Sequence, residues 1–493
     1  MDAVIINPLD NVAVALRDMK RGEKTDIGGS CVTLTDDVAR GHKIAIKDIE
    51  AGGPVIKYGT RIGIATSPVK CGSHVHTHNT RTALSGEGDY KYEPSVNELP
   101  VLPKRTFMGY KRPDGKTGIR NEIWIIPTVG CVNSVAQRLA AGNQDLVRGS
   151  VDGLYCFTHP YGCSQLSDDL AATKKILTSL VRHPNAGGVL VLSLGCENLT
   201  MEMFKEELKE WDEDRVKFLV CQNLDDELAE GRQLLMELSE YAGTFKRTER
   251  DAGELVIGLK CGGSDGLSGI TANPVAGRIT DMITSMGGSA VLTEVPEMFG
   301  AEEMLLNRCA DREIFDKAVG MINDFKKYFI DHGQVVYENP SPGNKAGGIT
   351  TLEDKSCGCV QKGGRAVVTD VLKYGEAVRS RGLTLLSGPG NDIVSTTALA
   401  AAGVHMILFT TGRGTPLGTP VPTIRISSNS DLYARKEKWI DINAGAIADG
   451  TKTGDEVAHM LFEQVMLTAS GKCTRQELNG YRDIAIFKDG VTL

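Results

Sequence analysis

The 493 residues are too many for a single hydrophobic core and predict two or three domains. A hydrophobic fraction of 41%, a charged fraction of 24% and a formal net charge of −8 are typical of a soluble protein and argue against nucleic acid or an anionic membrane as a partner. No apolar run approaches the ~20 residues that cross a bilayer and no signal peptide is found at the N-terminus, so we expect the twelve cysteines to be reduced thiols of a cytoplasmic protein.

Residues 1–90 predict a small all-β domain. Short apolar stretches separated by glycines have the spacing of strands in a compact sheet or barrel: 12–16, 31–34, 43–46 and 54–57. A polar segment with several prolines then predicts a linker over 91–104.

From residue 105 apolar runs alternate with amphipathic segments, which predicts an α/β fold with a mostly parallel sheet. The expected strands are 188–194, 216–221, 255–260, 290–293, 383–386, 406–410 and 423–426; the expected helices are 201–210, 225–241, 274–286, 301–330, 394–402 and 455–469. A new α/β segment near residue 380 suggests a catalytic domain over 105–380 and a C-terminal domain over 381–493.

Four apolar runs end beside cysteines: Cys131, Cys163, Cys196 and Cys261. Ligands of open α/β sheets bind outside the carboxyl ends of the strands, so we expect these thiols to converge on one crevice. Thiolates suit iron, iron–sulfur clusters and zinc, and their wide spacing disfavours a closed zinc site. Each could instead be a small buried hydrophobe. Cys359 is a further candidate ligand.

The second candidate site contains histidines. His74, His76 and His78 alternate, and alternating residues of a strand point to one face, where all three could bind a divalent cation. With His42, four of the nine histidines lie in the first 80 residues. The alternative is an exposed strand edge with solvated imidazoles.

Glycine-rich loops form the third candidate site. They carry Asp265, Asn344, Lys345 and Arg413, and the two basic side chains could neutralise a carboxylate. None of these loops has a nucleotide-binding pattern. His159 and Tyr161, just before Cys163, are candidates for proton transfer, or else packed structural residues.

Several sequence segments that contain these candidate residues resemble the altronate/galactarate dehydratase family of sugar-acid lyases, and the resemblance covers essentially the whole chain. The strings that carry the resemblance are Asp10–Leu16, Arg40–Lys43, Thr158–Cys163, Gly195–Asn198, Cys261–Gly266, Asn339–Lys345 and Thr411–Pro416. The resemblance implies an N-terminal SAF-type (β-clip) domain, a larger α/β catalytic region and dependence on iron or manganese. Cys357 stands where altronate-type sequences have an apolar residue.

The string His74–Asn79 is typical of family members that act on aldonic acids. The expected reaction is therefore the loss of water from D-altronate, which gives 2-dehydro-3-deoxy-D-gluconate. In this hypothesis Cys131, Cys163, Cys196, Cys261, His74 and His78 bind iron, as Fe(II) or a cluster, or manganese; His76, Asn344, Lys345 and Arg413 bind the substrate; and His159, Tyr161 or Asp265 exchanges the proton.

Three alternatives remain open at this stage. The chain could be a galactarate dehydratase or another hydroxy-acid lyase of the family, a non-catalytic sugar-acid sensor, or a nicotinamide oxidoreductase, although no dinucleotide fingerprint supports the last. A small sugar acid is the expected partner, and a homo-oligomer is left open.

Overall fold

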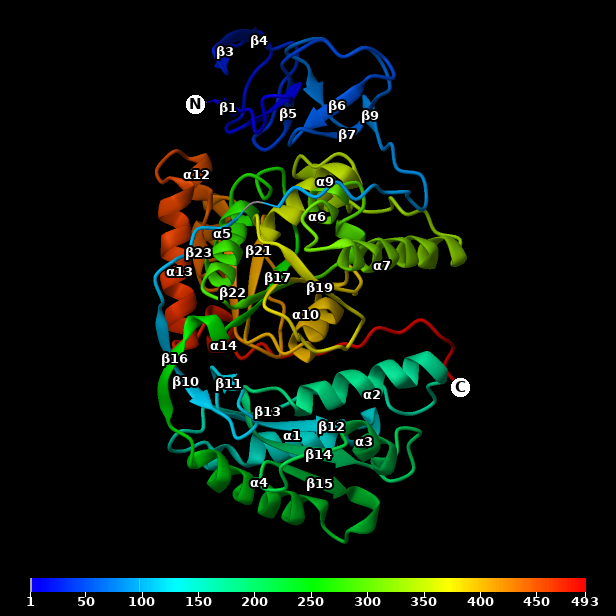
Figure 1. Cartoon of the computed structure of the whole chain (residues 1–493), viewed down its shortest axis with the longest axis vertical. Coiled ribbons are helices and arrows are strands. Elements are labelled where there is room, and N and C mark those ends of the chain that lie inside the picture. Colours follow the sequence, from blue (N-terminus) through cyan, green and yellow to red (C-terminus); the bar gives the residue numbers. More distant parts are fainter. Residues whose placement is uncertain (1, 97) are drawn as a thin grey trace.

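The structure, a computed structural model, describes residues 2–96 and 98–493. Three parts lie along the long axis of the molecule in Figure 1: an N-terminal β domain at the top, an α/β domain with a large sheet in the middle, and an α/β domain with a smaller sheet at the bottom. None of the described helices combines the length and apolar character needed to cross a membrane.

The N-terminal domain consists of short antiparallel strands, as the sequence predicts. Strands β1, β2, β5 and β8 form one sheet, β6, β7 and β9 a second, and β3 and β4 a hairpin. Their bounds are β1 Ala3–Val4, β2 Val12–Ala15, β3 Lys24–Ile27, β4 Ser30–Thr33, β5 Lys43–Ala45, β6 Pro54–Lys57, β7 Thr60–Ala65, β8 His74–Val75 and β9 Thr80–Arg81.

The described residues on either side of position 97, 84–96 and 98–105, have no regular structure and include contacts with the middle domain. The hydroxyl of Tyr90 donates to Glu302, and the hydroxyl of Tyr92 donates to the carbonyl of Cys309. The predicted linker is therefore a strap bound to the middle domain.

The lower domain is a four-stranded parallel sheet in the order β13-β12-β14-β15. Its strands are β12 Glu122–Pro127, β13 Gly153–Cys156, β14 Ala186–Ser193 and β15 Val216–Val220; its helices are α1 Asn133–Gly142, α2 Ser167–Val181, α3 Met201–Leu208 and α4 Glu227–Gly243. Helices α1 and α4 cover one face, and α2 and α3 pack against the other. A small antiparallel sheet, β11-β10-β16, flanks it (β10 Thr106–Lys111, β11 Thr117–Gly118, β16 Arg247–Asp251).

The middle domain is built on a parallel seven-stranded sheet in the order β19-β20-β18-β17-β21-β22-β23. The strands are β17 Val256–Cys261, β18 Ser289–Leu292, β19 Val368–Leu372, β20 Gly382–Leu386, β21 Met406–Thr411, β22 Thr423–Ser427 and β23 Ile442–Asn443. The helices are α5 Ala272–Ser285, α6 Glu303–Leu306, α7 Arg312–Asp331, α8 Pro342–Ala346, α9 Leu352–Cys359, α10 Asp392–Ala401, α11 Ser430–Arg435, α12 Gly445–Ala448, α13 Gly454–Ala469 and α14 Arg475–Leu478.

The domain boundary expected near residue 380 falls inside this sheet, because β19 and β20 on either side of it are paired. The α/β region divides instead near residue 251, where β16 ends and the large sheet begins. The single helix expected over 301–330 is two helices, α6 and α7, because the chain turns between them. Sequence periodicity identified the strands but could not show which strands share a sheet.

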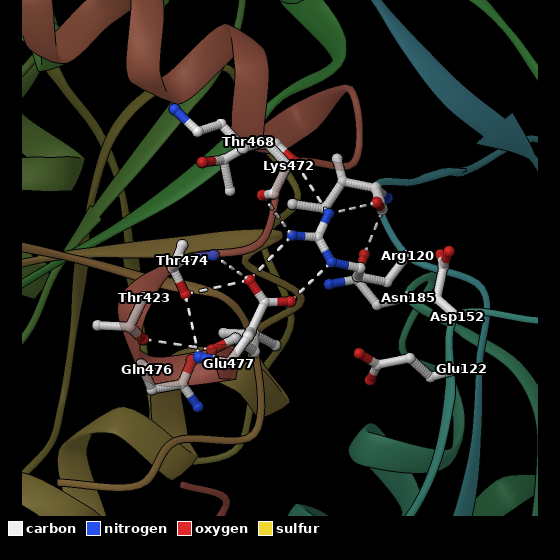
Figure 2. Close-up of polar contacts among 12 residues, drawn as sticks. Arg120, Glu122, Asp152, Asn185, Thr423, Thr468, Lys472, Thr474, Gln476 and Glu477 are labelled. Atoms are coloured by element: carbon white, nitrogen blue, oxygen red, sulfur yellow. Dashed lines mark hydrogen bonds and ion pairs between the residues drawn. The ribbon is translucent and has the colours of Figure 1, made fainter. Parts of the chain in front are cut away.

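A buried ion-pair network joins the lower and middle domains (Figure 2). Arg120 binds both carboxylate oxygens of Glu477 at 2.7 and 3.0 Å and also donates to the carbonyls of Thr468 and Lys472. Arg482 pairs with Glu122 nearby at 2.7 Å. Because both pairs are almost fully buried and bonded, they fix the lower domain against the C-terminal segment of the middle domain.

Candidate active site

The carboxyl edge of the seven-stranded sheet gathers the three glycine-rich loops that the sequence singled out. The loop after β17 carries Asp265, the loop after β21 carries Arg413, and α8 carries Asn344 and Lys345. A Cβ atom on Gly343 of α8 would lie 3.7 Å from Nε of Arg413, so the loop of Arg413 and the start of α8 are neighbours.

Two of these residues hold the loops in place. The carboxylate of Asp265 accepts hydrogen bonds from Ser268, from the hydroxyl of Ser428 at 2.8 Å and from the amide of Asn429 at 3.0 Å. Asn344 caps α8 through its Oδ1 and donates from Nδ2 to the carbonyl of Ser264 at 2.8 Å. The roles expected for Asp265 as a base and Asn344 as a substrate ligand would need these bonds to break.

Lys345 and Arg413 differ from Asp265 and Asn344 in their surroundings. Lys345 is half-buried and Arg413 is exposed, and neither takes part in a described ion pair. These are the free cations that a carboxylate ligand needs.

The N-terminal domain places its histidines directly over α8. The ring of His42 lies 5.0 and 5.1 Å from those of His76 and His74, and His78 lies 5.4 Å from His74. His76 Nε2 donates to the carbonyl of Lys345 at 2.9 Å. The histidine cluster, meaning these four residues, therefore meets Lys345 within one chain.

The sequence predicts that the histidines meet by alternation along one strand, but the structure brings them together in another way. Strand β8 contains only His74 and Val75, and the chain turns over His76–Asn79. The side chain of Asn79 bridges that turn, accepting from the amide of His76 and donating to the carbonyl of His74. A two-residue strand, followed by a turn that the side chain of Asn79 holds by hydrogen bonds, brings the rings together.

The hydrogen bonds of the cluster determine where its free nitrogen lies. His42 is bonded to the main chain of Ala346, so its other nitrogen, Nδ1, accepts from Nε2 of His74 at 3.0 Å. His74 is then protonated on Nε2, and its Nδ1 keeps a lone pair. Burial, reinforced by the neighbouring imidazoles, lowers the pKa of His74 to about 4, so this ring is neutral at pH 7 and in the form that binds metals.

Three of the predicted cysteines lie together in the lower domain. Cys131, Cys163 and Cys196 follow β12, β13 and β14 and are all exposed. Their loops are bonded to each other: Gly130 N–H donates to the carbonyl of Tyr161, and Leu199 N–H to that of Gly162. Gly162 is needed there, because at its φ of +96° a Cβ would lie 1.9 Å from the carbonyl oxygen of Thr128.

The expectation that Cys261 shares this crevice is wrong. Cys261 ends β17 in the other sheet and is buried beside Cys359 and Glu297. Within the described chain this trio is the one set of three His, Cys, Asp or Glu ligand atoms lying within 4.8 Å of one another. Lys362 already contacts the Cys261 sulfur at 2.8 Å and Lys355 the Glu297 carboxylate at 2.8 Å, so a cation would have to displace two ammonium groups.

His159 does not have the environment expected of a proton-transfer group. It is buried, its Nε2 donates to the carbonyl of Pro127 at 2.8 Å, and its Nδ1 accepts from the amide of Tyr161 at 3.2 Å. Burial lowers its pKa to about 4. With both nitrogens used, His159 shapes the loop that carries Cys163, and Tyr161 stacks on it at 6.0 Å.

We therefore expect His159→Ala to act on stability. Two buried main-chain groups would lose their partners, which should lower the free energy of unfolding by about 1–3 kcal/mol. Denaturant unfolding measures that loss. Turnover per folded molecule should stay within about two-fold of wild type; a hundred-fold loss without destabilisation would restore the catalytic role.

A cavity of about 530 Å³ between the lower and middle domains does not belong to this site. It lies at the amino ends of β17 and β21, and its lining includes Arg182 and Arg381. Arg182 donates to carbonyls at the end of α3, and Arg381 lies beside Gly287, just after α5. Arg182 is thus already engaged with a helix carboxyl end, where the dipole is negative.

Sequence reasoning missed one part of this site, the buried ions that dock the N-terminal domain. Asp354 of α9 pairs with Lys43 at 2.8 Å and with Lys57 at 3.0 Å, and all three are buried. Lys43 also donates to the carbonyl of Gly348 at 2.7 Å, beside α8. The signal in the sequence was the presence of Lys43 and Lys57 in otherwise apolar strands, where a lysine needs a buried partner.

In this site, imidazoles of a β domain lie over loops at the carboxyl edge of a parallel sheet, together with basic side chains that take part in no described ion pair. This arrangement defines the protein as a multidomain α/β enzyme. Family profiles match the chain in three consecutive parts: the altronate/galactarate dehydratase SAF domain over 1–83, the second domain of D-galactarate dehydratase/altronate hydrolase over 109–243, and the C-terminal D-galactarate/altronate dehydratase domain over 252–492. The chain belongs to the altronate/galactarate dehydratase family.

Curated relatives cover its whole length. The chain is 52% identical to an altronate dehydratase of Escherichia coli (strain K12), with all of both chains covered, and 52% identical to one of Bacillus subtilis (strain 168), with 99% of each covered. A galactarate dehydratase of Escherichia coli (strain K12) is 33% identical over 95% of this chain and 92% of its own. The expected SAF-type domain, α/β region and family are thus confirmed.

Proposed function

We propose that this protein is a metal-dependent hydro-lyase that converts D-altronate into 2-dehydro-3-deoxy-D-gluconate and water. The observation that carries the proposal is the contact of the histidine cluster with α8, which places imidazoles against the main chain of Lys345, on a helix that neighbours the loop of Arg413. Similarity to altronate dehydratases over the full chain supports the aldonic acid as substrate.

Lys345 and Arg413 are proposed to bind the substrate carboxylate. They approach from α8 and from the loop after β21, so together they can hold both oxygens and fix which end of the sugar acid faces the histidines. Asn344 and Asp265 act indirectly, since they hold α8 and the loop after β17 in position.

Imidazole nitrogen suits divalent iron, whereas manganese prefers oxygen ligands, and the cluster offers an unprotonated nitrogen. We assign His74 to the metal through its Nδ1. A bound Fe(II) or Mn(II) would supply Lewis acidity, polarising the bond to the departing hydroxyl and stabilising charge beside the carboxylate.

His78 is the proposed proton acceptor. Its ring is exposed beside His74, whereas those of His42 and His76 are bonded to the main chain of α8. The proton leaves C2, the hydroxide leaves C3, and the enol that results tautomerises to the 2-keto acid. The atoms balance as one altronate giving one keto acid and one water.

The test is direct. Purified full-length protein is incubated with D-altronate and Fe(II) or Mn(II), and the 2-keto acid is measured, with galactarate as the matched alternative substrate. Keto acid from D-altronate at a kcat/KM at least ten-fold above that with galactarate supports the proposal. No keto acid from either substrate would reject an enzyme and favour a sugar-acid sensor.

The exposed cysteines remain a separate metal proposal. Cys131, Cys163 and Cys196 could hold an iron–sulfur cluster through three thiolates. They lie at the edge of the lower sheet, whereas the histidine cluster lies at the junction of the upper two domains, so the two sites are distinct within one chain (Figure 1).

Replacing Cys163 by Ser tests this site by metal content. If the three thiols hold a cluster, protein purified without oxygen should lose most of its iron and sulfide in the variant, because one of three ligands is removed. Cys473→Ser, which changes an exposed cysteine outside the trio, should retain both. Equal iron in both variants would contradict a cluster at this edge.

A further inference from the structure

Two buried thiols of the middle domain lie in contact. The sulfur of Cys261, at the end of β17, lies 3.4 Å from the sulfur of Cys359, at the end of α9. Both residues are almost fully buried. Cys357, two residues away on the same helix, points elsewhere, with its sulfur 3.9 Å from the carbonyl of Gly300. The pairing is therefore specific to Cys261 and Cys359.

The surroundings make the two thiols unequal. Lys362 Nζ contacts the sulfur of Cys261 at 2.8 Å, which favours its thiolate, and the carboxylate of Glu297, 3.0 Å from the same sulfur, accepts a hydrogen bond from the thiol form. The hydrogen bond from Cys359 and the charges of Lys362 and Lys260 lower the pKa of Cys261 to about 7, against the effect of burial. That same hydrogen bond, together with burial, raises the pKa of Cys359 well above its usual value. Cys261 is therefore the more acidic thiol of the pair, and Cys359 is the one that keeps its proton.

A small cavity lies beside Cys359, one member of the pair. Cys359 lines a space of about 10 Å³ at the joint of the N-terminal and middle domains, together with Tyr58, Asp265 and Lys355. This volume admits about one water-sized molecule. A small neutral oxidant would therefore have to enter through this space, on the side of Cys359, whereas a bulky disulfide reagent is excluded.

We propose that Cys261 and Cys359 are an oxidation site at which hydrogen peroxide forms a reversible disulfide. The Cys261 thiolate attacks one peroxide oxygen, the O–O bond breaks, and the hydroxide released takes up a proton to become water, which leaves a sulfenic acid on Cys261. Cys359 loses its proton to the departing sulfenic hydroxyl, the S–S bond forms, and a second water leaves. Two thiols and one peroxide give one disulfide and two waters.

The disulfide would affect the site described above, and this part rests on the proposed function. Cys261 leads directly into the loop of Asp265, and α9 carries the Asp354 that docks the histidine cluster. Drawing the two sulfurs together moves both elements, and oxidation removes the thiolate that faces Lys362. We expect a roughly ten-fold loss of turnover, restored by dithiothreitol.

Peptide mapping tests the modification without using activity. Reduced full-length protein is treated with hydrogen peroxide, its free thiols are alkylated under denaturing conditions, and trypsin is added. Cleavage after Lys260 and Lys355 yields the peptides 261–278 and 356–362. The expected product is these two peptides joined through Cys261 and Cys359, with Cys357 in the same peptide alkylated as an internal control.

Variants separate the pair from the exposed thiols. Cys359→Ala should abolish the joined peptide and leave the activity that remains insensitive to brief peroxide treatment, whereas Cys357→Ala should form the link as the wild type does. Alkylation of Cys261 and Cys359 in the treated wild type, or a link from Cys261 to Cys357, would overturn the proposal. If D-altronate is not turned over by the reduced protein, the proposed function fails, but the mapping result stands.

Discussion

Replacing His74 by Ala should lower D-altronate turnover by about 10³-fold, the largest catalytic effect expected in this chain. The variant loses Nδ1 of His74, the nitrogen whose lone pair is left free by the hydrogen bond from Nε2 to His42, and with it the proposed metal contact. A 10³-fold loss corresponds to about 4 kcal/mol of transition-state stabilisation. The measurements are keto-acid formation at saturating Fe(II) and the affinity for Mn(II) by calorimetry, which should weaken in parallel.

Two histidine variants serve as controls for this result. His76→Ala should lower D-altronate turnover by a smaller factor, about 10–100-fold, because His76 holds α8 through the carbonyl of Lys345 and has no free nitrogen. His459→Ala changes an exposed imidazole on α13 and should leave both readouts unchanged. Unaltered Mn(II) affinity in His74→Ala would contradict the assignment of His74 to the metal.

Replacing Asp354 by Asn should lower the free energy of unfolding by about 3–5 kcal/mol, the largest stability effect expected. The substitution leaves Lys43 and Lys57 buried without a counter-charge, and an unpaired buried charge is costly. The N-terminal domain should also undock, which exposes the strap near residues 84–105 to proteases. Calorimetry and limited proteolysis measure the two effects.

The pH dependence of this loss has a definite sign. Although burial opposes ionisation, Lys43 and Lys57 hold the pKa of Asp354 well below its usual range. A carboxyl whose folded pKa is lowered stabilises the protein above its unfolded pKa, about 3.9, and loses that contribution as the pH falls further. The difference between wild type and Asp354→Asn should therefore be full at pH 7 and shrink below about pH 4.

Matched variants isolate the burial of this charge. Asp48→Asn removes the exposed partner of Lys70 in the same domain, 2.7 Å away, and should cost less than about 1 kcal/mol. Replacing Lys43, Lys57 and Asp354 together by Met, Met and Leu should lower the free energy of unfolding by less than Asp354→Asn alone, since no charge is left unpaired. Equal destabilisation by Asp48→Asn and Asp354→Asn would refute the docking role.

Much of the architecture could be predicted from local patterns. Apolar runs bounded by glycines identified β2, β5 and β6, and the alternation after residue 105 identified most strands and helices to within two residues. These predictions succeed because side-chain periodicity and turn residues act within a few positions of the chain. Arg413 and Lys345 were identified in the same way, as cations in glycine-rich loops.

The assignment of Cys261 shows where local patterns end. It follows an apolar run in the same way as Cys131, Cys163 and Cys196, yet β17 enters the seven-stranded sheet and β12, β13 and β14 enter the four-stranded one. Strand pairing joins residues far apart along the chain, so similar local patterns can serve different sites. The environment of His159 could not be predicted for a related reason, because its two hydrogen-bond partners become visible only in three dimensions.

The sequence alone determined the elements, the family and the kinds of side chain available for the reaction, because these depend on residue identity and short-range spacing. Tertiary structure decided which of those side chains meet. It brought the histidine cluster from the first 80 residues onto α8, paired Lys43 and Lys57 with Asp354 about 300 residues away, and set Cys261 against Cys359. These contacts follow from the burial of apolar faces of whole domains, a property of the entire chain that no short segment carries.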